Sequence, residues 1–409
     1  MRHRGSVDEP NGGKDFWDQS YYWFTKTIFR AIGHWPYQSR MELVMCRIAL
    51  HFAYWIQVVP QIVAVVCHYD NFDLVIEAMS SFIIDVAVMC NLTTFFFNSD
   101  KIQLLLEQVK EDWTIFPMNN GLKLLHEYTE LGKQRVILYS VGLYAAWFMF
   151  VSEPLYIKIF RLFRPSNKTV PLRFPIPVDY GPLDVEKYYY VILAVSAISI
   201  FGVVTVVVSA DILLFLYSQH ACGVFAALGV AIENLPVNVT TRKQTNDYEY
   251  QYLRKCVIIH HRILEFSNTI ESIFCWNFLM TIGLNMIVIS MTAVQVQIDM
   301  NCLAVTNLDA VALLLKTLMF MIATTSHLFI QCFMSQQITE SSLGVQQSVI
   351  NAKWYFSTAQ SKHLLQFMIM RSQIPCQLTA GRVILMSLNT FSSIIRTSAT
   401  YFTIFLDMQ

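Results

Sequence analysis

Stretches of twenty or more mostly apolar residues recur along this chain, and they limit its fold more than any other feature. Each stretch is long enough to cross a hydrocarbon core about 30 Å thick as a helix that rises about 1.5 Å per residue. The runs are continuous rather than alternating, which favours helices over the strands of a membrane barrel. We therefore expect an all-α, polytopic membrane protein with seven spans, at residues 43–66, 74–97, 136–157, 188–216, 270–294, 311–333 and 383–406.

The composition agrees with a membrane location. Charged residues make up 14% of the chain and hydrophobic residues 55%, whereas soluble domains carry about 25% charged residues. The 29 basic and 29 acidic residues cancel, so no general attraction to nucleic acid follows. The lipid bilayer is the partner that this composition predicts.

The distribution of basic residues predicts the orientation of the chain. Outside the seven spans, twenty Lys and Arg residues lie on one side of the membrane and six on the other. An excess of Lys and Arg marks the cytoplasmic side, which places the N-terminus in the cytoplasm and the C-terminus outside. In this orientation the sequon at Asn167 is extracellular and is expected to carry a glycan, whereas the sequon at Asn238 is cytoplasmic.

The segments between spans on the cytoplasmic side also carry apolar residues at helical spacing. One stripe comprises Ile102, Leu105, Leu106 and Val109, and it predicts an amphipathic helix outside the membrane. Such helices pack either as a small bundle within one chain or as a platform between subunits, and the sequence leaves both readings open. The outer segment 158–187 is rich in proline and aromatic residues, which is typical of a lid or of a plain connector.

Four regions follow from these patterns. Residues 1–42 form a cytoplasmic N-terminal segment, and residues 43–333 form six spans with their cytoplasmic helical extensions. Residues 334–382 form a cytoplasmic helical anchor segment, and residues 383–409 form the seventh helix and an extracellular C-terminus.

Catalytic signatures are absent from the sequence. It contains no H-E-x-x-H, no G-x-S-x-G, no Walker loop and no dinucleotide fingerprint, so we expect neither an enzyme nor a cofactor or metal site. Charged residues do occur within the spans, and these should face protein or water because exposure to lipid is costly. Asp85 is the deepest acid, and its pairing with Lys316 of the sixth span is a hypothesis.

The seventh span carries a polar stripe. Its members recur at alternating steps of three and four, which places them on one helix face: Thr390, Ser393, Thr397, Thr400, Ile404 and Asp407. Hydroxyl groups followed by an aliphatic residue and an acid suit a water-filled cation path with a hydrophobic constriction. Several subunits would be needed to surround an ion. The alternative is that small hydroxyl residues mediate helix contacts within the bundle.

Residues 387–391 and 396–405, with the core Tyr401-Phe402-Thr403, resemble the seventh-helix signature of insect odorant receptors. Residues 378–381 resemble the segment that precedes that helix in the family. The tail from Ile404 departs from the usual leucine-rich version. The resemblance implies a heterotetrameric, odorant-gated, non-selective cation channel in the plasma membrane of an olfactory dendrite. In it, this chain is the tuning subunit beside the shared odorant receptor co-receptor, which has a much longer second cytoplasmic loop.

The resemblance also implies roles for particular residues. Ile404 matches the hydrophobic gate and Asp407 the polar position one turn outward, while Thr397 and Thr400 line the pore. A small volatile odorant would bind in the outer half of the bundle among spans two to six. Candidates chosen for aromatic, apolar or hydroxyl character at suitable depth are Phe82, Ser140, Tyr144, Trp147, Tyr190, Met286 and Leu314.

Three other functions compete with this interpretation. One is a chemoreceptor that has no pore of its own and signals with or without a G protein, although the Asp-Arg-Tyr and Asn-Pro-x-x-Tyr patterns are absent from the sequence. Another is a gustatory-type receptor channel, whose seventh helix usually ends in a Gln-Phe pattern that this chain lacks. A transporter is disfavoured because no pair of interrupted spans suggests inverted repeats.

Overall fold

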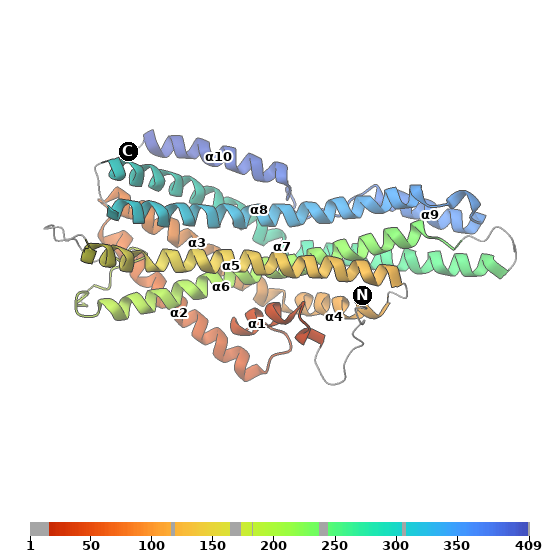
Figure 1. The fold of residues 1–409 in the computed structure, drawn as a ribbon, viewed down its shortest axis with the longest axis horizontal. Helices are drawn as coiled ribbons and strands as arrows, with labels where there is room; N and C mark the ends of the chain where they lie inside the picture. Colours follow the sequence, from red (N-terminus) through yellow and green to blue (C-terminus); the bar gives the residue numbers. More distant parts are fainter. Residues whose placement is uncertain are drawn as a thin grey trace, which may run out of the picture.

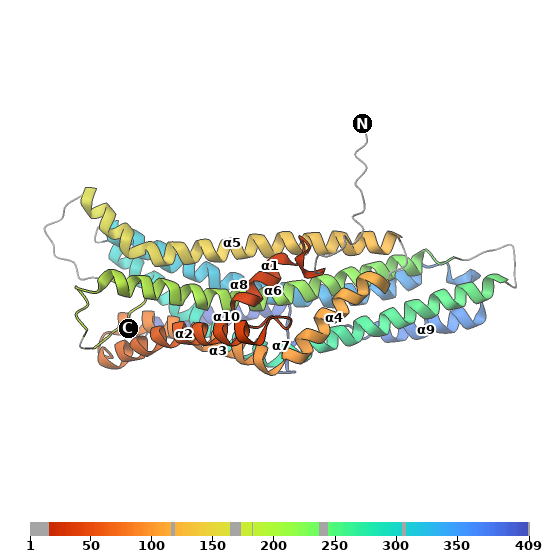
Figure 2. The ribbon, with the colours of Figure 1, turned by 90° about the horizontal axis from the view of Figure 1, so that it is seen from below.

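The computed structural model describes residues 16–115, 119–163, 173–181, 183–236, 244–304 and 308–407. It is an elongated helical bundle (Figures 1 and 2), which confirms the all-α prediction. Its helices are α1 Trp23–Ala31, α2 Arg40–Cys67, α3 Phe72–Phe97, α4 Ser99–Ile115, α5 Asn119–Phe163, α6 Tyr189–Glu233, α7 Gln244–Ala304, α8 Leu308–Asn351, α9 Ala359–Ser372 and α10 Leu388–Asp407. Two 3-10 turns (Phe16–Asp18 and Trp354–Phe356) and the short strands β1 (Thr379–Ala380) and β2 (Ile384–Leu385) complete the described chain.

Four long helices, α5 to α8, run along most of the bundle (Figure 1). They contain 44 to 61 residues, which corresponds to lengths of about 66 to 92 Å at 1.5 Å per residue. That is two to three times the thickness of a hydrocarbon core, so each helix continues well beyond it. Helices α2, α3 and α10 lie along one half of the bundle, and α4 and α9 lie along the other (Figures 1 and 2).

Helix α6 is the central helix, packed mainly against α5 and α8. From Thr205 to Gly229 nearly all of its side chains are buried, as expected for a helix that is apolar on all sides. Helix α7 packs against α3, α8 and α10. The α4 stripe of Ile102, Leu105 and Val109 is buried as the sequence predicted, so this segment packs within the chain.

Five helices are long and apolar enough to cross a membrane among the residues that the structure describes. They are Arg40–Cys67, Gly121–Ile159, Tyr189–Glu233, Tyr248–Asn301 and Ala310–Asn351. These five establish a multi-pass membrane protein. The other two predicted spans fall on α3 and α10, which are not among these five.

Side-chain caps explain where several helices begin. Ser39 accepts a hydrogen bond from the Glu42 amide at the start of α2, and Asn71 accepts one from the Leu74 amide at the start of α3. Such caps satisfy amide groups that lack a partner inside the helix. The predicted spans and the observed helices therefore agree closely at these two starting points.

Two predicted helical stretches are interrupted. The seventh helix begins at Leu388 rather than at Val383, because Val383 belongs to a tight turn between β1 and β2 in which Gly381 and Arg382 both have positive φ. The Val383 amide donates to the Ala380 carbonyl at 3.2 Å. The predicted helical anchor segment 334–382 is also not one continuous helix, because α8 ends at Asn351 and α9 starts only at Ala359.

Candidate functional site

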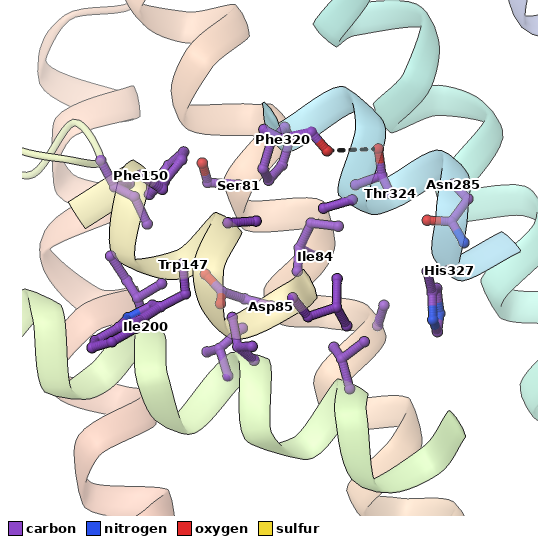
Figure 3. Close-up of a pocket in the computed structure, with 18 of the residues that line it drawn as sticks. Ser81, Ile84, Asp85, Trp147, Phe150, Ile200, Asn285, Phe320, Thr324 and His327 are labelled. Carbon is purple, nitrogen blue, oxygen red and sulfur yellow. Dashed lines mark hydrogen bonds between the residues drawn. The ribbon is translucent and has the colours of Figure 1, made fainter. Parts of the chain in front are cut away.

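A cavity of about 130 Å³ lies inside the bundle, in the half that contains α2 and α3 (Figure 3). Its volume is close to the roughly 150 Å³ of an engineered apolar cavity that binds benzene, so it suits one small molecule. The lining comes from six helices and one loop residue: Gln57, Ser81, Ile84, Asp85, Ala87, Asn91, Leu143, Ala146, Trp147, Phe150, Ile176, Ile200, Val203, Val204, Val207, Asn285, Phe320, Ala323, Thr324 and His327.

Several polar groups in this wall are satisfied by neighbouring groups. Ser81 donates to the Glu77 carbonyl at 3.3 Å, and Thr324 donates to the Phe320 carbonyl at 3.1 Å. The Asn91 amide oxygen accepts from Asn277 at 2.8 Å. These groups therefore add polarity without requiring a ligand.

Three other polar side chains in the wall are different. Gln57 on α2, Asp85 on α3 and Asn285 on α7 are 1%, 3% and 5% exposed. Both amide atoms of Gln57, Oδ2 of Asp85 and Nδ2 of Asn285 have no hydrogen-bond partner among the described residues. Buried polar atoms are nearly always hydrogen-bonded in native proteins, so these atoms mark the wall as a place where a polar group of a ligand or water fits.

A polar network closes one side of the cavity. His327 lines the cavity, and its Nδ1 lies 2.6 Å from Oδ2 of Asp211 on α6. The Tyr139 hydroxyl on α5 also donates to this carboxylate, and Gln331 donates to its other oxygen at 3.3 Å. The network joins α5, α6 and α8.

The described part of the outer segment covers another side. Ile176 is 6% exposed and contributes to the cavity wall, and the Pro175 carbonyl accepts from Lys316 Nζ at 3.1 Å. Lys316 also pairs with Glu77 of α3 at 2.5 Å. A charge pair between the second and sixth predicted spans is therefore present, but its acid is Glu77 and not Asp85. The placement of Ile176 favours the lid interpretation of this segment.

A second, more open hollow runs between α5 and α8. It has a volume of about 470 Å³ and is lined mainly by apolar residues. The charged residue Arg135 also lines it. Leu143, Ala146 and Ala323 line both this groove and the central cavity. Small side chains at two of these three positions make the partition between the two spaces thin.

Of the seven predicted ligand-binding residues, only Trp147 belongs to the described lining. Tyr144 lies behind it, because both rings contact Phe201, and the Tyr144 hydroxyl bonds to Thr205. Ser140 is buried on α5, and its hydroxyl has no hydrogen-bond partner within the described part of the chain.

The other four lie away from the lining. Phe82 and Met286 are partly buried in the core, and Leu314 is partly buried on α8. Tyr190 is 60% exposed at the start of α6, where Lys158 donates to its hydroxyl.

Four of the lining residues that are absent from the predicted set share one property. Gln57, Asn285, Thr324 and His327 are polar residues inside otherwise apolar spans. Asp85 was singled out as the deepest acid but was assigned to a charge pair. Polarity at mid-span, more than aromatic character, would have indicated this wall.

The pore and gate candidates lie on α10, which packs on α7 through one face. Ile394 and Ser398 are buried in this contact, where Ser398 donates to the Met286 carbonyl and its own carbonyl accepts from Ser290.

The candidates occupy another face. Thr400 and Ile404 are exposed and Thr397 is half-buried, and no neighbouring helix of the described chain covers this stripe. Asp407 is the last residue of α10, and its side chain, like the Asn167 sequon, lies outside the described part.

The chain is 19% identical over 282 residues to Odorant receptor 63a of Drosophila melanogaster, an alignment that covers 68% of this chain and 65% of that receptor, and so less than two thirds of its length. It is 22% identical to Odorant receptor 85b of the same species, over 94% of this chain and 98% of that one.

Among solved structures, the insect olfactory receptor OR5 from Machilis hrabei in complex with eugenol superposes with a TM-score of 0.73. That superposition covers 94% of this chain and 97% of the other at 17% identity, and it shows the same fold. The family model for 7tm Odorant receptor matches residues 71–399. The chain therefore belongs to the 7tm Odorant receptor family.

Proposed function

We propose that this chain is the odorant-binding subunit of a heteromeric, odorant-gated, non-selective cation channel. In this proposal all seven spans cross the membrane, the N-terminus lies in the cytoplasm, and the partner is the odorant receptor co-receptor. The α10 helices of several subunits line the pore, with Thr397 and Thr400 along the path, Ile404 at the gate and Asp407 one turn outward. The site for the odorant is the central cavity.

One observation carries the proposal: a single short stretch of α7 contacts both the cavity and α10. Asn285 lines the cavity, and the next residue, Met286, accepts a hydrogen bond from Ser398 of α10 at 3.2 Å. Ser290, one turn further, donates to the Ser398 carbonyl at 3.0 Å. A ligand that shifts α7 therefore acts directly on the helix that carries the gate candidates.

The open stripe on α10 supports a pore made by more than one subunit. One helix cannot surround an ion, and Ile404 is 48% exposed although it is a large aliphatic residue. Rings of aliphatic residues in a narrow pore gate by dewetting. A ligand opens such a gate only if it binds the open arrangement more tightly than the closed one.

The test is whole-cell current during exposure to a panel of volatiles, in cells that express this chain with and without the co-receptor. We expect odorant-evoked cation current only with both subunits. Ser398→Ala should weaken the response to odorant while surface expression remains. Odorant responses that require an added G protein and carry no current through this chain would contradict the proposal.

A further inference from the structure

The unpaired carboxyl group of Asp85 is the most unusual feature of the cavity wall. Its Oδ2 is buried and has no hydrogen-bond partner, and no ion pair among the described residues includes it. None of the lining residues is Lys or Arg. A buried carboxyl group normally has a cation or a hydrogen-bond donor beside it, because its desolvation is otherwise uncompensated.

Asp85 is centrally placed for an anchoring role. In Figure 3 it lies near the middle of the labelled residues, with Trp147 and Phe150 toward one side and Asn285 and His327 toward the other. The basic groups of the region are engaged elsewhere. Lys316 pairs with Glu77 and binds the Pro175 carbonyl, and His327 contacts Asp211.

The other residues of the wall determine the size and polarity of the rest of the ligand. Most lining residues are aliphatic or aromatic, and the volume of about 130 Å³ fits roughly one ring with a short head group. Resting on the proposed function, we infer that the cavity selects small apolar molecules that carry a hydrogen-bond donor, a hydroxyl or an amine, and that Asp85 accepts that donor. Gln57 and Asn285 offer further unpaired atoms in the same wall.

The two donor classes engage Asp85 differently. An alcohol donates its hydroxyl hydrogen to a carboxyl oxygen, and its own oxygen is free to accept from an amide such as that of Gln57 or Asn285. A protonated amine forms a charge-assisted bond to the carboxylate, which is the stronger kind. Aldehydes and hydrocarbons of the same size lack a donor and leave Asp85 unpaired.

The experiment compares four probes that share one ring: benzyl alcohol, benzylamine, benzaldehyde and ethylbenzene. Each is titrated against the purified full-length chain in lipid nanodiscs, and its dissociation constant is taken from the concentration dependence of the unfolding midpoint. We expect both donor probes to bind at least about tenfold more tightly than the other two, as one hydrogen bond to a carboxyl group allows.

Three variants separate the role of Asp85 from general effects on the wall. Asp85→Leu should remove the preference for donors, and it should fold because no described side chain loses a partner. Asp85→Asn keeps an acceptor oxygen but no charge, so it should retain benzyl alcohol and lose benzylamine. Ser80→Ala is the matched control on the same helix, because Ser80 does not line the cavity and its hydroxyl already bonds to the Ile76 carbonyl.

Any of four results would overturn the inference. They are equal affinities across the four probes, tighter binding of benzaldehyde, no binding of either donor probe, and an unchanged preference for donors in Asp85→Leu. The proposed function is tested separately by current. Asp85-dependent binding of a donor probe that never evokes current with the co-receptor would contradict the channel proposal and leave this ligand preference standing.

Discussion

His327 Nδ1 and Asp211 Oδ2 lie 2.6 Å apart and join α8 to α6 directly beside the central cavity. Asp211 is fully buried, and Tyr139 and Gln331 bond to the same carboxylate. His327, a residue of the cavity wall, therefore also belongs to the network that holds three long helices together. Changes in this network should affect stability and ligand binding at the same time.

We expect Asp211→Ala to destabilise the protein by about 2 to 5 kcal/mol, since three cross-helix bonds are lost and each is worth about 0.6 to 1.7 kcal/mol in a membrane protein. Asp211→Asn should cost less, because its amide oxygen still accepts from Tyr139 or His327. Thermal unfolding of the purified protein measures both. An Asp211→Ala midpoint equal to that of the wild type would show that the network contributes little.

Filling the cavity should lower odorant sensitivity without loss of the channel. Ala146→Leu places a larger side chain in the wall that the cavity shares with the α5–α8 groove. We expect the half-maximal odorant concentration to rise at least about tenfold, because the odorant loses a few apolar contacts. Gly142→Ala is the control. Gly142 lines only the groove, and a Cβ at this position meets no atom within 4 Å. An Ala146→Leu dose response that matches the control would place the odorant elsewhere.

The helices could be predicted from sequence to a large extent, because apolar runs and helical spacing are local patterns. The start of α2 near residue 40 and the buried α4 stripe follow directly from such patterns. The β1–β2 turn was missed because it depends on two residues, Gly381 and Arg382, inside an apolar context. Nothing in a periodicity argument separates that short turn from the first turn of a helix.

The site was predicted much less well, and the reason is geometric. Which face of a helix borders a cavity depends on the rotation of each helix against its neighbours, which single-helix patterns do not contain. Trp147 lies in the wall, whereas Tyr190, chosen on the same grounds, is largely exposed. The pairing of Lys316 with Glu77 instead of Asp85 follows from a similar cause, since both acids lie on α3 two turns apart.

Ile404→Ala should raise the current that flows without odorant when the chain is expressed with the co-receptor, because a smaller side chain weakens a hydrophobic gate. Folding should be nearly unaffected, since Ile404 is 48% exposed in the single chain. Thr403→Ala is the matched control, an exposed neighbour that lies off the polar stripe. Equal resting currents in the two variants would argue against Ile404 as the gate.

Gly381→Ala should be more harmful than Gly181→Ala, although both glycines have a φ near +60°. The shared backbone strain costs about 1 kcal/mol. A Cβ on Gly381 would also lie 2.7 Å from Leu279 Cδ2, whereas a Cβ on Gly181 meets nothing within 4 Å. The difference in unfolding midpoint therefore measures how tightly the β1–β2 turn sits on α7. Leu279→Ala should restore part of the loss, and no restoration would assign the cost to the backbone alone.

His34, between α1 and α2, should make the protein less stable in acid. Burial, together with the positive charge of Arg47, lowers the pKa of His34 from 6.5 to about 3. Between these two values the unfolded chain binds a proton at this position and the folded chain does not, so stability falls as the pH drops below 6.5. The contribution is constant above that pH, and its slope is at most about 1.4 kcal/mol per pH unit.

The comparison uses thermal unfolding of the wild type and of His34→Phe from pH 7.5 to pH 5. Phenylalanine retains the packing of the His34 ring against Phe95 and carries no titrating group, so the variant should lose less stability over this range. Other buried histidines titrate equally in both proteins, and they cancel in the difference. Parallel pH profiles would show that His34 is protonated in the folded chain as readily as in the unfolded one.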